Sequence, residues 1–158
     1  MTGDDNYPVD IAVVLEDPAW GVEAESICRL AAAAALETAG CEGGDLCIVL
    51  SDNAHVAALN SRFRHLEGPT NVLAFAAGAP GQLGDVILAR ETTAEEARTR
   101  GNALAAQLSH LVVHGTLHLL GFGHQDDDEA RHMEAMEARV MATLGIADPY
   151  AAERVGVE

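Results

Sequence analysis

Three histidines near the end of the chain have the spacing of a metal site. His114 and His118 are four residues apart, so on a helix their imidazoles project from the same face, one turn apart. Gly121 can adopt a positive φ and end that helix, so that the chain turns back and presents His124. Three neutral imidazoles bind zinc with an open fourth coordination position, which is typical of catalytic sites. We therefore expect His114, His118 and His124 to bind one zinc ion.

Gly115 limits the chemistry that this zinc would support. A glutamate at this position would complete the long H-E-x-x-H-x-x-G-x-x-H signature of metzincin proteases, in which the glutamate is the general base beside the metal. Glycine has no side chain for that role. A carboxylate there is expected to lie where an anionic phosphate would approach. The sequence thus predicts the metal ligands without the protease base, which disfavours peptidase activity and leaves other zinc-dependent hydrolysis open.

Apolar periodicity predicts the elements that position these histidines. Apolar residues between Leu104 and Leu119 recur at three- and four-residue steps, which is one face of a helix. Strands are predicted at residues 9–15, 46–50, 71–76 and 85–89, and helices at 22–38, 53–62, 92–101, 104–120 and 127–144. Loops are predicted at Gly68-Pro69 and over the Gly/Pro-rich residues 78–84. The predicted fold class is α+β: a small mixed β-sheet covered by helices, with the metal-binding helix in the centre.

Length and composition restrict the number of domains, the location and the mode of RNA binding that the sequence allows. The chain has 158 residues, the size of one ordinary domain, and no long linker divides it, so residues 1–158 are predicted to form a single domain. It contains no run of 18 apolar residues, and its acidic, polar start does not resemble a signal peptide, so we expect a cytoplasmic protein. A net charge of −16, with arginine as the only cationic residue type, argues against broad, non-specific coating of RNA. A small site remains compatible with that charge.

The histidine segment also resembles a known family. HGTLHLLGFGH, at residues 114–124, is similar to the signature of the YbeY family of bacterial endoribonucleases, also called ribosomal RNA maturation factors. The resemblance extends over roughly residues 45–150. Further similar blocks lie at residues 59–64, 69–75, 83–86, 127–130 and 133–137. Two positions depart from the family pattern: Gly123 stands where the family usually has Asp, and Ala74 where it usually has Ser.

This resemblance implies a zinc-dependent endoribonuclease, specific for single-stranded RNA, that matures the 3′ end of small-subunit ribosomal RNA and acts in ribosome quality control. It implies ribosomal RNA and the ribosome or its small-subunit proteins as partners, with no membrane and no DNA. Arg64 lies in a block that resembles an arginine position of the family, and a guanidinium can clamp a phosphate in bidentate fashion. Arg64 and His114 are therefore the predicted catalytic residues.

Two other functions stay open from the sequence. A metalloprotease-like hydrolase would use the same ligands, and the glycine at position 115 counts against it. A non-catalytic ribosome-assembly factor, in which zinc only stabilises the fold, is disfavoured by the open coordination position and favoured by Gly123 and the acidic surface.

Several residues near the ligands have expected supporting roles. His110 lies one turn before His114 and is expected to border the site, either as support for a ligand or exposed to solvent. The acidic run Asp126-Asp127-Asp128 is expected to cap the last helix, with a contact to a ligand histidine as the alternative.

Overall fold

The computed structural model describes residues 9–64, 70–123 and 125–151, apart from the side chains of Val9 and Arg64. Its strands are β1 (Val9–Leu15), β2 (Gly44–Ser51), β3 (Val72–Ala79) and β4 (Gln82–Ala89). Its helices are η2 (Pro18–Trp20, a 3₁₀ turn), α1 (Glu23–Thr38), α2 (Asn53–Arg64), α3 (Arg90–Arg100), α4 (Leu104–Leu119) and α5 (Asp127–Thr143). In this described part, four strands form one sheet in the order β1-β2-β4-β3, with β3 antiparallel to β4 and the other neighbours parallel. The predicted α+β class with a mixed sheet is confirmed.

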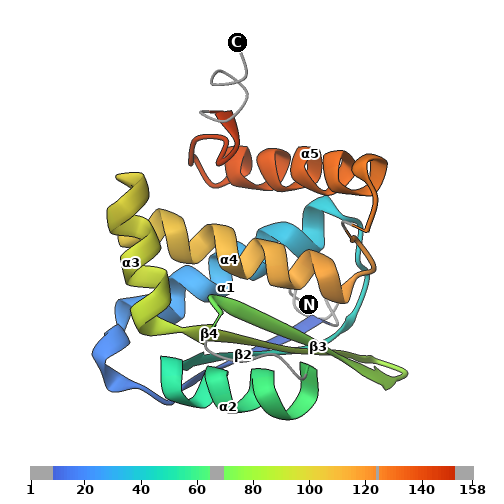
Figure 1. Cartoon of the computed structure of the whole chain (residues 1–158). Coiled ribbons are helices and arrows are strands. Elements are labelled where there is room, and N and C mark those ends of the chain that lie inside the picture. Colours follow the sequence, from blue (N-terminus) through green and yellow to red (C-terminus); the bar gives the residue numbers. More distant parts are fainter. Residues whose placement is uncertain (1–8, 65–69, 124, 152–158) are drawn as a thin grey trace, which may run out of the picture.

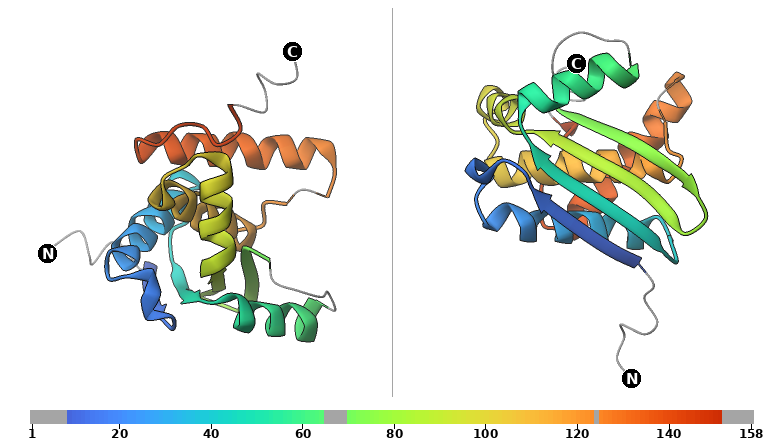
Figure 2. Two further views of the ribbon diagram at one scale, coloured as in Figure 1. Left: turned by 60° about the vertical axis from the view of Figure 1, so that its left-hand side comes forward. Right: turned by 90° about the horizontal axis from the view of Figure 1, so that it is seen from below.

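Helices cover both faces of the sheet. Helix α2 lies against one face, α1 and α4 lie against the other, and α5 lies on the outer side of α4 (Figure 1; Figure 2 shows the sheet from the side of α2). Side chains of β4 alternate between the two faces, as a strand buried on both sides requires. Val86 and Leu88 join the core beneath α1 and α4, whereas Ile87 and Ala89 pack in the smaller cluster beneath α2.

Helix α4 packs against most of the other elements, and the prediction that it binds a metal stays a prediction. It contacts α1, α3, α5 and two strands of the sheet, and ten of its sixteen residues are buried. Gly121, just beyond its end, has a φ of 102°, so the predicted positive φ at this helix terminus is confirmed. A helix packed from several sides holds its side chains in fixed rotamers, which suits it to carry a site.

The predicted loop over residues 78–84 is wrong, because the flanking strands continue into it. β3 and β4 form a hairpin that turns at Pro80-Gly81. Gly84 remains within β4, where an added Cβ would meet the Phe75 carbonyl oxygen at 2.1 Å. The ladder shifts register between Ala76 and Ala79. Glycines in this segment therefore allow a bulge and a close strand approach instead of breaking the sheet.

The start of α3 also differs from the prediction, since the helix begins at Arg90 and not at Thr92 or Thr93. Asn53, the first residue of α2, accepts a hydrogen bond from the Thr92 amide at 3.1 Å, and its own amide donates to Glu91 Oε1 at 2.8 Å. The two helix starts thus cap each other through space, which a local sequence pattern cannot reveal.

Within residues 9–64, 70–123 and 125–151, every helix is too short or too polar to cross a lipid bilayer.

Candidate metal centre

Two of the three predicted zinc ligands lie together on α4. The rings of His114 and His118 meet edge to face with their centroids 4.7 Å apart, and both side chains are half-buried. They line a cleft of about 400 Å³ between α4 and β3, the edge strand of the sheet. The other lining residues are Thr70, Asn71, Val72, Leu73, Ala74, Ala76, Gly115 and Leu119. The predicted helical spacing therefore brings two imidazoles to one wall of a cleft that a small part of a substrate can enter.

Glu137 of α5 fixes the orientation of His114. Its side chain is fully buried, and its Oε2 lies 2.7 Å from His114 Nδ1. With a carboxylate at Nδ1, that nitrogen carries the proton and Nε2 keeps its lone pair, which is the tautomer a metal ligand needs. A carboxylate behind a histidine is also the usual support of a zinc-binding imidazole. His114, His118 and this carboxylate fit a zinc site.

The second oxygen of Glu137 is also satisfied. Oε1 lies 2.7 Å from His110 Nε2, and it accepts a hydrogen bond from the Tyr150 hydroxyl at 2.5 Å. Burial by itself raises the pKa of Glu137, but the hydrogen bonds from His110 and His114 outweigh it and hold that pKa at about 2. Glu137 is therefore a buried carboxylate that remains charged because several donors surround it.

The sequence predictions gave Glu137 no role, although a signal was present. Met133, Glu137, Val140 and Met141 are the buried residues of α5, at helical spacing. A carboxylate in the middle of a buried apolar stripe needs a buried partner. His110, expected to border the site, is 8% exposed and shares Glu137 with His114. Of the two expected roles for His110, the structure supports that of a supporting residue.

Gly115 faces the sheet and is required by close packing. A Cβ at this position would lie 2.8 Å from Val86 Cγ1 and 3.4 Å from Val72 Cγ2. Any side chain here would thus start against β4 and β3. A glutamate at this position would therefore have to displace Val86 before its carboxylate could lie beside the metal, and the expected effect of such a carboxylate stays a prediction.

Several predicted features lie outside the described residues. They are His124, the side chain of Arg64 and the turn at Gly68-Pro69. Among the residues that the structure describes, no three Cys, His, Asp or Glu side chains gather as a metal site would need. The third ligand and the phosphate clamp therefore stay predictions. Arg64 itself is the last residue of α2, directly after Phe63, whose ring packs edge to face on Phe75 of β3 at 5.7 Å.

Gly123, which precedes the third predicted ligand, lies beside a carboxylate from α5. A Cβ at position 123 would be 3.1 Å from Glu129 Oε1. The same oxygen accepts a hydrogen bond from the Gln125 amide at 3.3 Å, while Asp126 caps α5 through the Glu129 amide at 2.8 Å. The predicted cap is confirmed. An aspartate in place of Gly123 would bring a second carboxylate next to Glu129.

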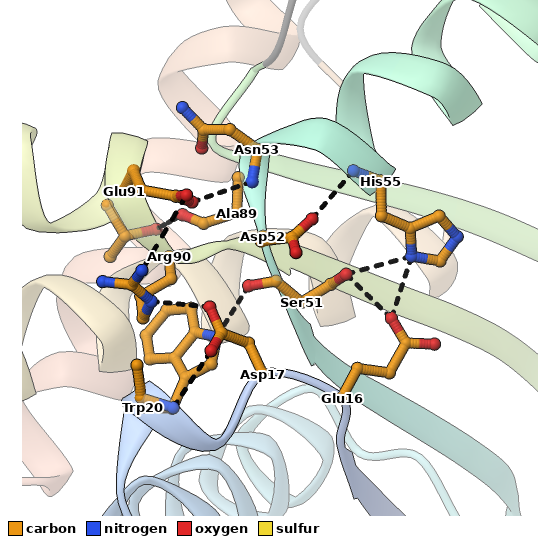
Figure 3. Close-up of polar contacts among 12 residues, drawn as sticks. Glu16, Asp17, Trp20, Ser51, Asp52, Asn53, His55, Ala89, Arg90 and Glu91 are labelled. Atoms are coloured by element: carbon orange, nitrogen blue, oxygen red, sulfur yellow. Dashed lines mark hydrogen bonds and ion pairs between the residues drawn. The ribbon is translucent and has the colours of Figure 1, made fainter.

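A second polar cluster lies at the carboxyl ends of β1, β2 and β4 (Figure 3). Ser51 Oγ donates to Glu16 Oε1 at 2.8 Å and lies 2.9 Å from His55 Nδ1. His55 Nδ1 is 2.8 Å from the same Glu16 oxygen, so these three atoms are all within hydrogen-bonding distance of one another. Ligands often bind at this end of parallel strands. Here the polar groups instead bind one another, and Ser51 is buried, so the cluster ties the strand ends together.

Comparison with known proteins identifies relatives over most of the chain. Residues 16–145 match the family model described as Endoribonuclease YbeY. The chain is 47% identical over 154 residues to an endoribonuclease YbeY of Azorhizobium caulinodans, covering 90% of this chain and 97% of that protein. A second endoribonuclease YbeY, from Paramagnetospirillum magneticum, is 49% identical over 157 residues, covering 90% and 96%.

A solved structure shares the fold. The solution structure of TM1509 from Thermotoga maritima superimposes with a TM-score of 0.57, covering 88% of this chain and 97% of that one. Because the two sequences are 21% identical, the similarity concerns the fold alone.

Proposed function

Because this chain belongs to the YbeY endoribonuclease family, we propose that it is a zinc-dependent endoribonuclease that cleaves single-stranded RNA. The proposal places it in the cytoplasm, where it matures the 3′ end of small-subunit ribosomal RNA and acts in ribosome quality control. Its partners are then ribosomal RNA and the ribosome or small-subunit ribosomal proteins. Residues 1–158 form the single domain that carries this activity.

One observation of the structure supports the proposal most directly. His114 and His118 line the cleft beside β3, and the buried carboxylate of Glu137 holds the Nδ1 side of His114 away from it. An imidazole fixed in this way offers Nε2 to a metal without further rearrangement. His114, His118 and His124 are the proposed ligands, and zinc would stabilise negative charge on a phosphate oxygen.

Arg64 is the proposed phosphate clamp, with His114 as the second catalytic residue. Arg64 ends α2, and the preceding Phe63 packs on β3, the strand that lines the cleft. A guanidinium that reaches this cleft would pair with two phosphate oxygens and stabilise the extra charge that develops during cleavage.

Packing around Gly115 speaks against a metalloprotease-like hydrolase. A general base at this position would have to displace Val86, whose side chain is completely buried. A non-catalytic assembly factor with a structural zinc is the remaining alternative, and Gly123 and the acidic surface are the observations in its favour.

One experiment separates the three functions. Protein purified without a His-tag is analysed for zinc, loaded with it, and assayed on single-stranded RNA, on duplex RNA and on casein, each beside His114→Ala. We expect one zinc per chain and cleavage of single-stranded RNA that is lost in the variant. Casein cleavage would indicate the protease. Zinc binding without turnover of any substrate would indicate the assembly factor.

A further inference from the structure

A second pocket, of about 380 Å³, continues the cleft past His114 toward the N-terminal end of α4. It shares Asn71, Val72 and His114 with the first cleft, so one strand of substrate can pass from one pocket to the other across the histidine. Its remaining lining residues are Glu95, Glu96, Thr99, Arg100, Gln107, His110, Leu111 and Tyr150. A volume of this size is at the lower end of the range of small-ligand pockets, about 300–1,000 Å³.

The polar groups on one wall of this pocket are fixed in place. Glu96 accepts from Asn71 Nδ2 at both oxygens, at 3.0 and 3.1 Å, and from Gln107 Nε2 at Oε1, at 3.3 Å. Gln107 is 2% exposed and itself accepts from Asn102 Nδ2 at 3.1 Å. A carboxylate has about four acceptor positions. The three bonds from described residues therefore leave Glu96 Oε2 with room for one more donor.

Charge and shape decide which part of an RNA strand suits the pocket. Glu95 is paired with Arg98. Arg100, a further lining residue, donates to the Pro149 carbonyl at 3.0 Å. Among the described residues, Glu96 accepts only from neutral amides and would repel a phosphate beside it, so the backbone phosphate is better placed over the histidines. An uncharged base that donates a hydrogen is compatible with Glu96. Tyr150 adds an aromatic ring, held by its hydroxyl on Glu137 and packed edge to face on His110 at 5.5 Å. Aromatic rings of this kind are the usual surface on which single-stranded bases stack.

We propose that this second pocket receives the nucleobase next to the scissile phosphate and favours a base whose exocyclic amino group donates to Glu96 Oε2. The described residues that line the first cleft include no carboxylate, so this cleft would accept the neighbouring nucleotide with less discrimination. This inference rests on the proposed function and adds a specificity-determining residue, Glu96, to it.

The test uses unstructured oligouridine substrates with a single guanosine, and the same substrates with inosine, which differs only in lacking the 2-amino group. Adenosine and purine riboside, which differ only in the 6-amino group, form a second pair. Zinc-loaded parent protein should cut at a junction beside the purine. For at least one pair, removing the amino group should lower kcat/KM at that junction about tenfold, equivalent to about 1.4 kcal/mol.

Glu96→Gln tests the assignment to this residue. A charged acceptor makes a hydrogen bond roughly twice as strong as a neutral one, so the tenfold preference should fall to about threefold. Glu23→Gln, an exposed change in the first turn of α1, removes the same charge at a residue that does not line the pocket and should keep the full preference. The comparison of RNA substrates uses only the parent protein. The preference for the amino group can therefore be measured even if Glu96→Gln folds poorly.

The outcomes separate this inference from the proposed function. If parent protein cleaves these RNAs but treats both members of each pair equally at every junction, the pocket does not read the amino group. If the preference is present but unchanged in Glu96→Gln, another residue reads it and the assignment to Glu96 is wrong. If zinc-loaded parent protein cleaves no RNA at all, the proposed function itself fails.

Discussion

Glu137 illustrates how one side chain can organise a site that it does not enter. Its two oxygens contact His110, His114 and Tyr150, which come from α4 and from the segment after α5. A fully buried carboxylate without these donors would be strongly destabilising. With them, it fixes the ring of His114 against α5. The position of one proposed metal ligand therefore depends on a residue 23 positions later in the chain.

Glu137→Gln should weaken zinc binding about 10- to 100-fold, the usual effect of removing a carboxylate behind a histidine ligand. An amide can accept from one histidine, but its NH₂ group must then face the other ring or the Tyr150 hydroxyl. Competition with a chromophoric chelator measures the affinity. Glu134→Gln, one turn earlier on α5 and outside this network, is the control. Equal zinc affinity of Glu137→Gln and the parent would show that His114 needs no such partner.

At the scale of elements, the packing of α4 on the sheet determines where His114 and His118 lie relative to β3. Gly115 lies one residue after His114 and three before His118. Because it has no side chain, α4 approaches β4 closely at Val86. A larger residue would push the helix away from β3 and change the cleft that both strand and helix line.

Gly115→Ala should lower the free energy of unfolding by up to about 2 kcal/mol. Alanine in a helix is normally better than glycine by about 0.8–1 kcal/mol, but overpacking against a buried valine costs about 1–3 kcal/mol. Urea denaturation of Gly115→Ala, Val86→Ala and the double variant measures the coupling. The double variant should be more stable than the sum of the single losses predicts, by about 1 kcal/mol. Strict additivity would mean that the two residues do not clash.

Polar side chains join the carboxyl ends of β1 and β4. Arg90, at the start of α3, donates to Asp17 Oδ2 at 2.6 Å, just beyond the end of β1 (Figure 3). The hydrogen bond from Arg90 lowers the pKa of Asp17 below its ordinary value of 3.8. A carboxyl with a lowered pKa in the folded state stabilises the fold above its unfolded pKa, and that contribution is lost as the pH falls through the folded pKa.

Asp17→Asn should therefore lower the melting temperature at neutral pH. The difference between parent and variant should narrow as the pH falls below about 3.8, where the parent carboxyl begins to lose this advantage. Thermal melts of both proteins between neutral and acidic pH measure it, with the exposed Asp45→Asn as the control. A constant difference over the whole range would contradict a role for the Asp17 charge.

Because the net charge of the whole molecule is −16, we expect RNA to bind only at a small site. Without a broad cationic surface, only a few phosphates can be neutralised, in the proposed site by Arg64 and the metal. For single strands, the slope of log K against log salt is about −0.7 for each neutralised phosphate.

Binding of a labelled single-stranded RNA should accordingly depend weakly on salt, with a slope no steeper than about −2. Arg64→Ala should reduce the magnitude of that slope by about 0.7 and lower cleavage, with zinc content unchanged. Arg64→Lys should restore the slope but only part of the cleavage, because an ammonium cannot make the bidentate contact. Fluorescence anisotropy across salt concentrations provides the measurement. A slope unaffected by Arg64→Ala would remove Arg64 from the RNA contact.

The sequence alone determined the features that depend on local periodicity. The order and approximate positions of the strands and long helices, and the positive φ of Gly121, follow from local sequence patterns. The placement of His114 and His118 on one helix face follows from their four-residue spacing. The α+β class follows from the order of these elements, and the resemblance of residues 114–124 indicated the family to which the chain belongs.

Only the tertiary structure decided which distant residues meet. The Glu137 carboxylate behind His114, the Val86 side chain against Gly115 and the mutual capping of α2 and α3 all join residues 23 or more positions apart. No local pattern encodes such a contact, because it depends on how helices pack on the sheet. The second pocket has the same origin: its walls come from β3, α3, α4 and Tyr150, which are adjacent only once the chain has folded.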